Sequence, residues 1–210
     1  MPIIHHASPK IRPRPRWHRP RLCASETRMA APHIVALGGT LRAESATGRL
    51  LAAALALAEA RGARTTLLTG ADIAFPHYEP GVADGNAEIG RYLEALRSAD
   101  AVIVGSPGYH GTLSGLVKTA LDYCEQLSKD ERPYLDGLPV GLIATAAGWQ
   151  AAVSTLQALR TITHSLRGWP TPMGLAINTV ESKDCVGDSH AQMTVMVDQI
   201  LGFLERRAPA

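Results

Sequence analysis

Short, continuous apolar runs alternate with longer amphipathic segments along most of the chain. Runs of this length that end near glycine, proline or polar residues are typical of strands buried on both faces. We expect five such strands, at residues 33–38, 64–68, 101–104, 139–144 and 173–177. Strands that alternate with helices predict right-handed βαβ units, and therefore an α/β fold with a parallel five-stranded sheet covered by helices on both faces.

Apolar residues at intervals of three and four predict the helices between these strands. The helices are expected to end near Gly62, to span about 87–97, and to present apolar faces over 113–124, 152–166 and 193–204. Cys124 lies on such a face, which indicates a core residue rather than a catalyst. Lys118 and Asp122 are one turn apart and are expected to form a structural ion pair. Residues 70–86 are rich in Gly, Pro and Asp and predict a long loop of the kind that often carries function.

Charge divides the 210 residues into a short tail and one domain. Residues 1–30 hold seven of the 21 basic residues, one of the 19 acidic residues and five of the 14 prolines. The remainder therefore has a net charge of about −4, and the tail has no hydrophobic periodicity. We expect a disordered basic Pro/Arg-rich tail over 1–30 and a single domain over 31–210. A nucleic-acid arm, a transit peptide and a membrane-surface patch are alternatives for the tail, as is a natural start at Met29.

Other features of composition exclude several classes of protein. No apolar run approaches the roughly 18 residues of a membrane span. The three cysteines lack CxxC spacing, which disfavours a disulfide scaffold or a structural zinc site, and His77, His164 and His190 lack the spacing of metal ligands. A cytoplasmic protein without a bound metal is therefore expected.

The loop after the first strand has the composition of a phosphate site. It reads Gly-Gly-Thr-Leu-Arg-Ala-Glu-Ser-Ala-Thr over 38–47, with glycines, hydroxyls, one arginine and a helix start. Free N–H groups and the helix dipole favour an anion there, and Arg42 can add a charged contact. The pattern is neither a Walker motif nor GxGxxG. The alternative is that Ser45 merely caps the helix and Thr40 satisfies a turn.

The loop after the third strand carries a more specific motif. Residues 105–123 read Gly-Ser-Pro-Gly-Tyr-His-Gly-Thr-Leu-Ser-Gly-Leu-Val-Lys-Thr-Ala-Leu-Asp-Tyr. They resemble the S/T-P-x-Y-x-G/A-x-x-S/P-G-x-x-K-N-A-L-D pattern of the NAD(P)H-dependent FMN reductase family of flavodoxin-like flavoproteins. The first loop is similar to that family's G-S-x-R-x-x-S-x-N. The resemblance runs from about Ile34 to the last helix and implies a flavodoxin-like three-layer sandwich.

This resemblance implies a set of FMN-binding residues. Those expected at the 5′-phosphate are Thr40, Arg42, Ser45 and Thr47, and those expected along the ring and ribityl chain are Pro107, Gly108, Tyr109, His110 and Gly111. Thr145, Ala146, Ala147, Gly148, Trp149 and Gln150 match the second flavin-flanking loop less closely. Gly108 replaces the Glu of many members, and Thr119 replaces the Asn of K-N-A-L-D. Backbone contacts to flavin would survive both changes.

The implied reaction is hydride transfer from reduced nicotinamide, NADPH or NADH, to flavin N5. Electrons then pass to an acceptor, or reduced flavin passes to a partner such as a flavin-dependent monooxygenase. No protein nucleophile is needed, so no catalytic residue is assigned. The family also implies a homodimer or homotetramer. A quinone or azo-compound reductase remains an alternative, as does an electron-carrier flavodoxin, although such carriers tend to be more acidic than this domain.

Overall fold

The computed structural model describes residues 31–81 and 85–207. The expected basic tail over 1–30 lies outside these residues. Within the described chain, no helix is long and apolar enough to cross a membrane.

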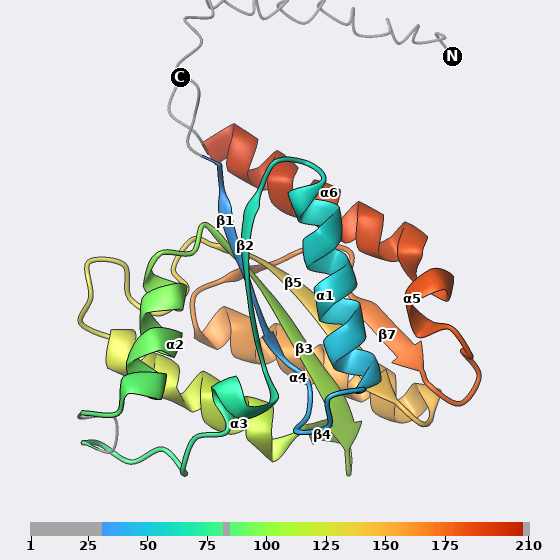
Figure 1. The fold of residues 1–210 in the computed structure, drawn as a ribbon, viewed down its shortest axis with the longest axis horizontal. Coiled ribbons are helices and arrows are strands. Elements are labelled where there is room, and N and C mark those ends of the chain that lie inside the picture. Colours follow the sequence, from blue (N-terminus) through green and yellow to red (C-terminus); the bar gives the residue numbers. More distant parts are fainter. Residues whose placement is uncertain (1–30, 82–84, 208–210) are drawn as a thin grey trace, which may run out of the picture.

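A parallel sheet forms the middle layer of the molecule (Figure 1). Its strands are β1 His33–Gly38, β2 Arg64–Thr69, β3 Ala101–Tyr109, β5 Pro139–Ala146, β6 Trp169–Pro170 and β7 Leu175–Asn178. The order is β2-β1-β3-β5, and both β6 and β7 pair with β5 beyond it. This is the 2-1-3-4-5 order of flavodoxin-like folds, with the fifth position shared by two short strands.

Helices cover both faces of the sheet, which confirms the expected three-layer α/β sandwich. They are α1 Ala46–Glu59, α2 Ala87–Arg97, α3 Gly115–Asp122, α4 Trp149–Ser165, α5 Cys185–Asp188 and α6 His190–Arg207, with short 3-10 helices η1 Gly70–Ile73 and η2 Tyr123–Leu127. Buried side chains of α1, α5 and α6 form one hydrophobic cluster with the sheet. Those of α2, α3 and α4 form a second cluster on the opposite face.

Two strands differ from their expected bounds. β3 continues past Val104 to Tyr109, because Gly105, Ser106 and Pro107 still pair with β5. The expected strand over 173–177 is present as β7, which begins later, at Leu175, and the short β6 pairs with β5 before it because the chain leaves the ladder around Pro172. After β3 the chain reverses into β4 Thr112–Leu113, which pairs with β3 in the antiparallel direction. The sequence did not predict this strand, because Leu113 fits the apolar face of the next helix. The turn between them, His110–Gly111, has positive φ at both residues, as a type I′ turn requires.

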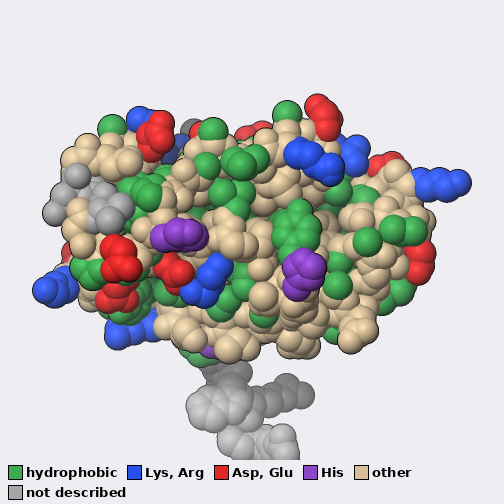
Figure 2. Space-filling view, turned by 90° about the horizontal axis from the view of Figure 1, so that it is seen from below, with side chains coloured by type: hydrophobic (Ala, Val, Ile, Leu, Met, Phe, Trp, Pro, Cys, Tyr) green, Lys and Arg blue, Asp and Glu red, His purple; other side chains and the backbone are tan. Residues whose placement is uncertain are grey.

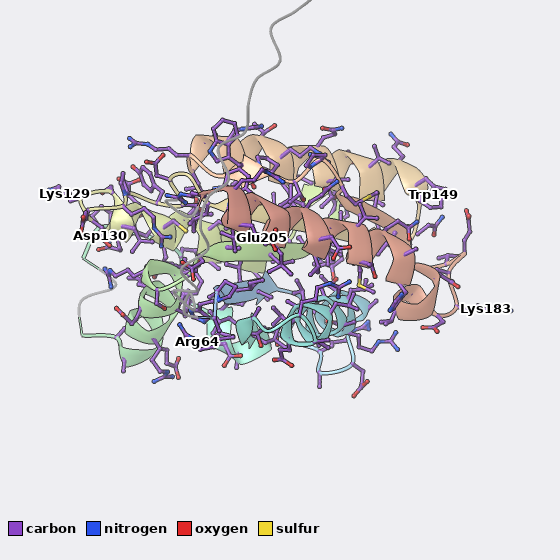
Figure 3. All side chains as sticks on the ribbon, turned by 90° about the horizontal axis from the view of Figure 1, so that it is seen from above. Arg64, Lys129, Asp130, Trp149, Lys183 and Glu205 are labelled. Atoms are coloured by element: carbon purple, nitrogen blue, oxygen red, sulfur yellow. The ribbon has the colours of Figure 1, made fainter. Side chains whose placement is uncertain are left out.

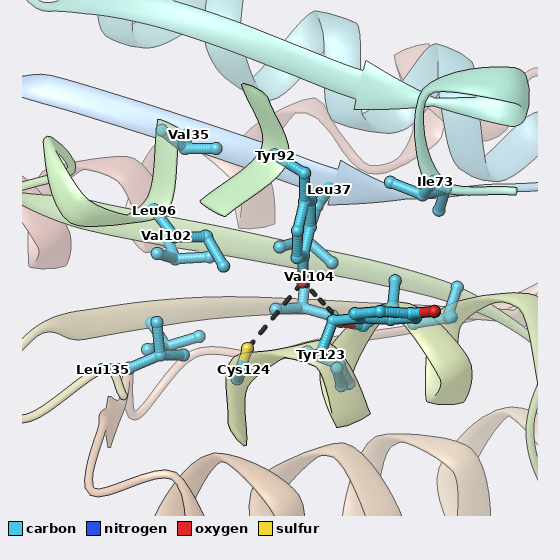
Figure 4. Packing of buried hydrophobic residues seen from close by; sticks show 14 of the residues in the cluster. Val35, Leu37, Ile73, Tyr92, Leu96, Val102, Val104, Tyr123, Cys124 and Leu135 are labelled. Atoms are coloured by element: carbon cyan, nitrogen blue, oxygen red, sulfur yellow. Dashed lines mark hydrogen bonds between the residues drawn. The ribbon is translucent and has the colours of Figure 1, made fainter. Parts of the chain in front are cut away.

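An aromatic cluster holds the first part of the long 70–86 loop against the second hydrophobic layer. Phe75 makes edge-on contacts with Tyr92 and Tyr123, and Tyr78 makes one with Tyr123. The Tyr92 hydroxyl donates to the Ala120 carbonyl at 2.7 Å and lies 3.8 Å from the Cys124 sulfur (Figure 4). Burial raises the pKa of Cys124 to about 12, so its thiol stays protonated and belongs to the core, as its helical position predicts.

His33 fastens the start of the sheet and gives a prediction about pH. Its buried ring contacts the Ser98 carbonyl through Nδ1 at 3.2 Å and the Thr66 hydroxyl through Nε2 at 2.8 Å. Burial lowers the pKa of His33, so below about pH 6.5 the unfolded chain binds a proton that the folded chain resists. We predict that the free energy of unfolding falls as pH drops from 7.5 to 5.5, and that His33→Gln flattens this fall. Urea titrations at both pH values measure it.

The exposed His164 supplies the matched control for this prediction. His164→Gln should not flatten the fall of the free energy of unfolding toward low pH, because no buried ring is removed. An equal flattening in both variants, or in neither, would contradict the role given to His33.

Candidate functional site

A cavity of about 520 Å³ opens at the carboxyl ends of the parallel strands. Figure 2 looks onto this end of the molecule, where hydrophobic side chains lie among basic, acidic and histidine side chains. The loop after β1, the last residues of β3 and β5, and the residues directly after β5 and β7 contribute to the cavity. Its lining residues are Thr40, Arg42, Glu44, Ser45, Ala46, Pro107, Gly108, Tyr109, Thr145, Ala146, Ala147 and Thr179. The volume lies within the roughly 300–1,000 Å³ of small-molecule sites.

Two glycines let the loop after β1 run against the end of β3. A Cβ atom on Gly38, whose φ is +137°, would lie 1.8 Å from the Gly105 carbonyl oxygen. The Gly39 N–H donates to that same oxygen at 3.0 Å. Only glycine permits this approach, which carries the chain directly from the sheet to the start of α1.

The N-terminal turn of α1 presents donors and one positive side chain. Ser45 caps the helix by accepting from the Gly48 N–H at 3.0 Å, and the Thr40 hydroxyl accepts from the Arg42 N–H at 3.1 Å. Both local roles that the sequence offered for these residues are therefore present. Within the described residues, the N–H groups of Ala46 and Thr47 have no protein acceptor, and Arg42 has no ion pair. Free N–H groups at a helix start beside a positive side chain are the groups with which proteins commonly hold anions.

Two side chains of this loop do not match the role expected of a phosphate-binding residue. Thr47 is buried and its hydroxyl bonds to that of Thr145 at 2.7 Å, so Thr47 can serve an anion through its N–H but does not line the cavity with its side chain. Glu44 is exposed and does line the cavity, which places a negative charge on the wall that also holds Arg42.

The end of β3 forms a second wall around Gly108. A Cβ atom here would lie 2.5 Å from the Thr155 hydroxyl oxygen and 3.0 Å from the Ala151 carbonyl oxygen of α4. Thr155 is fully buried, and its hydroxyl is without a hydrogen-bond partner in the structure. Gly108 therefore lets α4 pack directly beneath the cavity wall, and this chain has no room for the Glu of many family members.

The remaining expected residues divide between the cavity and its surroundings. Pro107, Tyr109, Thr145, Ala146 and Ala147 line the cavity, and Tyr109 is 54% exposed at its edge. The residues outside the lining are His110, Gly111, Gly148, Trp149 and Gln150. His110 and Gly111 form the exposed β3–β4 turn, while Trp149 faces a neighbouring cavity.

Ala46 and Thr179 line the cavity but were not expected there. Thr179 follows β7, and its N–H and hydroxyl both contact the Ala146 carbonyl oxygen, at 2.8 and 3.2 Å. The sequence could have indicated Thr179. The last predicted strand ends at the same edge of the sheet as the other strands, so the loop after it could also line a ligand site. Within residues 31–81 and 85–207, His, Cys, Asp and Glu side chains form no cluster of three that could hold a metal.

Comparison with known proteins decides the family. Residues 32–181 match the family model described as NADPH-dependent FMN reductase. The chain belongs to this family. It is 35% identical over 119 residues to an FMN-dependent NADPH-azoreductase of Staphylococcus aureus, a match that covers 53% of this chain and 60% of that protein. A protein of the same description from Staphylococcus haemolyticus is 29% identical over 133 residues, which covers 60% of this chain and 67% of the relative.

A solved structure agrees with this fold assignment. The flavoenzyme NAD(P)H:(acceptor) oxidoreductase FerB of Paracoccus denitrificans superposes with a TM-score of 0.67 at 20% identity, over 84% of this chain and 98% of that one. At this level of identity, the likeness establishes the flavodoxin-like fold that the family predicts.

The interlock of Gly108 with Thr155 is testable by substitution. We predict that Gly108→Ala lowers the free energy of unfolding by about 1–3 kcal/mol, because the new methyl group overlaps the Thr155 hydroxyl. Adding Thr155→Ala should recover part of this loss. Gly115→Ala is the matched control, since a Cβ there meets no atom within 4 Å. Denaturant titration measures all four chains, and equal costs at positions 108 and 115 would disprove the interlock.

Proposed function

We propose that this chain is an NADPH-dependent FMN reductase with FMN in the cavity at the strand ends. The observation that carries the proposal is the pairing of an anion-binding helix start with a glycine-lined wall in one cavity of about 520 Å³. The residues present fit FMN: among the described residues, unpartnered N–H groups and Arg42 suit a phosphate, and the wall of Pro107, Gly108 and the half-exposed Tyr109 suits a flat ring. Bound FMN supplies the redox chemistry between reduced nicotinamide and an acceptor.

The phosphate wall acts through charge and preorganised donors. The N–H groups of Ala46 and Thr47 stand at the positive end of α1, a 14-residue helix. Arg42, Ser45 and Thr40 complete this wall with one guanidinium and two hydroxyls. Thr47 supports it from behind, because its hydroxyl ties α1 to Thr145 of β5.

The opposite walls act through shape. Pro107, Gly108 and Tyr109 offer backbone groups and one aromatic ring, and Thr145, Ala146 and Ala147 offer small side chains across from them. These residues hold and orient a flat cofactor and exclude water from its faces. None of them needs to transfer a proton, and we assign no catalytic residue. His110 and Trp149 contribute to the surroundings of the site rather than to its lining.

The acceptor is proposed to be an organic compound such as an azo compound or a quinone. The names of the staphylococcal relatives support an azo compound, and those relatives are matched over 60–67% of their length. Release of reduced flavin to a flavin-dependent monooxygenase is the second route that we propose. An electron-carrier flavodoxin is less well supported, because the matching family model is that of reductases.

We also propose that the chain forms a homodimer or homotetramer and acts in the cytoplasm. Leu41 and Val180, 69% and 71% exposed, lie beside the cavity-lining residues Arg42 and Thr179 and support contact with a second copy. The free cysteines Cys124 and Cys185 are consistent with a reducing compartment.

Anaerobic mixing of the FMN-loaded protein with NADPH tests the proposed activity. We predict rapid loss of the visible absorbance of oxidised flavin, and a faster loss with NADPH than with NADH. FMN that binds tightly and keeps its absorbance would instead indicate an electron carrier. Free FMN mixed with NADPH at the same concentrations is the control for the uncatalysed reaction.

The two charged side chains of the phosphate wall should have opposite effects on FMN affinity. Arg42→Ala is predicted to weaken binding by about 1.5–3 kcal/mol, the value of a hydrogen bond to a charged group. Glu44→Gln is predicted to tighten binding by a few-fold, because it removes a like charge from the same wall. Flavin fluorescence titration measures both. A Glu44→Gln variant that binds FMN more weakly would place the phosphate elsewhere.

A further inference from the structure

A pair of buried hydroxyl groups joins the end of β5 to the start of α1. The oxygen of the Thr145 hydroxyl lies 2.7 Å from that of Thr47, the second residue of α1. Thr47 is 1% exposed and Thr145 is 3% exposed. Thr145 lines the cavity of about 520 Å³, whereas Thr47 does not. The pair therefore reaches from the interior of the protein to the wall of the cavity.

The sheet places Thr145 on the face that α1 covers. Side chains two residues apart on a strand share a face, and Ile143 of β5 belongs to the hydrophobic cluster with α1. Ala144 belongs to the cluster with α4 on the other face. Figure 3 shows α1 and α4 on opposite sides of the molecule, with Trp149 at the start of α4. The Thr145 side chain thus lies between the carboxyl end of β5 and the first turn of α1.

The two hydroxyl groups carry one hydrogen more than their mutual bond uses. Each hydroxyl donates one hydrogen bond and accepts up to two. Neither has another hydrogen-bond partner within residues 31–81 and 85–207. One of the two hydrogens is therefore without an acceptor in this part of the chain.

Burial decides which hydroxyl carries the unused hydrogen. If Thr145 donated to Thr47, the unused hydrogen would lie on Thr47, which is buried away from the cavity, and a buried donor without an acceptor is unfavourable. If Thr47 donates to Thr145, the unused hydrogen lies on Thr145, where a ligand in the cavity can accept it. The second arrangement is therefore the favourable one.

The surroundings of this donor are those of the phosphate wall. The N–H groups of Ala46 and Thr47 stand at the positive end of α1 and have no acceptor among the described residues. Because Thr145 bonds to the side chain of Thr47, its hydroxyl lies at the same corner of the cavity. A phosphate has several oxygens and can accept from several such donors at once.

We propose that the Thr145 hydroxyl donates to the phosphate of the bound flavin, and that Thr47 is a positioning residue that orients this hydroxyl. This inference rests on the proposed function. Thr47 donates to Thr145, and Thr145 donates onward to a phosphate oxygen. Successive hydrogen bonds of this kind polarise one another, so the last one is strengthened. Thr47 thus serves the phosphate twice, directly through its N–H and indirectly through its hydroxyl.

The affinities for FMN and riboflavin test the donor, because these flavins differ only in the phosphate. Fluorescence titration gives both dissociation constants, and the ratio of the riboflavin value to the FMN value is the phosphate preference. We predict that Thr145→Val, which keeps the shape of the side chain and removes the hydroxyl, lowers this preference about tenfold and leaves the affinity for riboflavin unchanged. Thr145→Ser, which keeps the hydroxyl, should retain the preference.

The role of Thr47 is tested in combination with Thr145. Thr47→Val should lower the phosphate preference by about threefold, because Thr145 keeps its hydrogen but loses the partner that orients it. Thr47→Ser should restore the preference. In the Thr145→Val background, Thr47→Val should cause no further loss, because the Thr47 hydroxyl acts through Thr145. Losses that multiply in the double variant would contradict the positioning role.

Thr163→Val is the matched control. Thr163 is also a buried threonine, but its hydroxyl donates to the Leu159 carbonyl at 2.8 Å within α4, and it does not line the cavity. Its substitution should leave the phosphate preference unchanged. Urea titration of the flavin-free proteins shows which variants fold. The double valine variant, which leaves neither hydroxyl of the pair unpaired, provides the same test of the donor if Thr145→Val does not fold.

Failure of this inference can be distinguished from failure of the proposed function. Flavin bleaching by NADPH together with an unchanged phosphate preference in Thr145→Val refutes the donor alone, as does an equal weakening of both flavins. A lowered preference in a protein that NADPH does not bleach supports the donor and refutes the reductase activity. A wild-type protein that binds neither flavin, or both equally, refutes the donor and the proposed phosphate wall together.

Discussion

The close approach of β1 to β3 at Gly38 and Gly105 is the constraint on which the site depends. The Gly105 carbonyl occupies the place where a side chain on Gly38 would begin, and it also accepts from the Gly39 N–H. The chain after β1 is therefore held against the end of β3 before α1 starts. Gly105 in turn packs against Leu51 of α1, since a Cβ atom on Gly105 would lie 2.9 Å from that side chain. One crowded crossing thus positions the start of α1, where the N–H groups of Ala46 and Thr47 find no acceptor among the described residues.

The chemistry of the cavity follows from which groups these loops present. One wall offers N–H groups, hydroxyls and a guanidinium, whereas the facing walls offer glycine, proline, alanine and one tyrosine. Such a site distinguishes ligands by a charged end and a flat body, and it contributes orientation and electrostatics rather than acid or base groups. Glu44 is the exception, since it adds a negative charge to the wall that also holds Arg42.

Much of this architecture could be predicted from the sequence because apolar runs and helical spacing report burial directly. The strands at 33–38 and 139–144 and the core position of Cys124 are examples. The β3–β4 hairpin was missed because Leu113 fits both a two-residue strand and the face of the next helix. Local periodicity cannot predict contacts between residues far apart in the sequence. Examples are the hydrogen bond between Thr47 and Thr145, 98 residues apart, and the one between Trp149 and Glu181, 32 residues apart. The resemblance to a family pointed to the two loops that we propose bind FMN, but it could not predict contacts peculiar to this chain, such as that between Gly108 and Thr155.

The central claim is that the start of α1 recognises the phosphate of a flavin whose ring lies against Pro107, Gly108 and Tyr109. Comparison of FMN with riboflavin, which has the same ring and no phosphate, tests it most directly. With several charge-assisted contacts, each of about 1.5–3 kcal/mol, FMN should bind at least about 100-fold more tightly than riboflavin. Arg42→Ala should reduce that difference while leaving the affinity for riboflavin unchanged. Equal affinities of the wild-type protein for the two flavins would contradict the account.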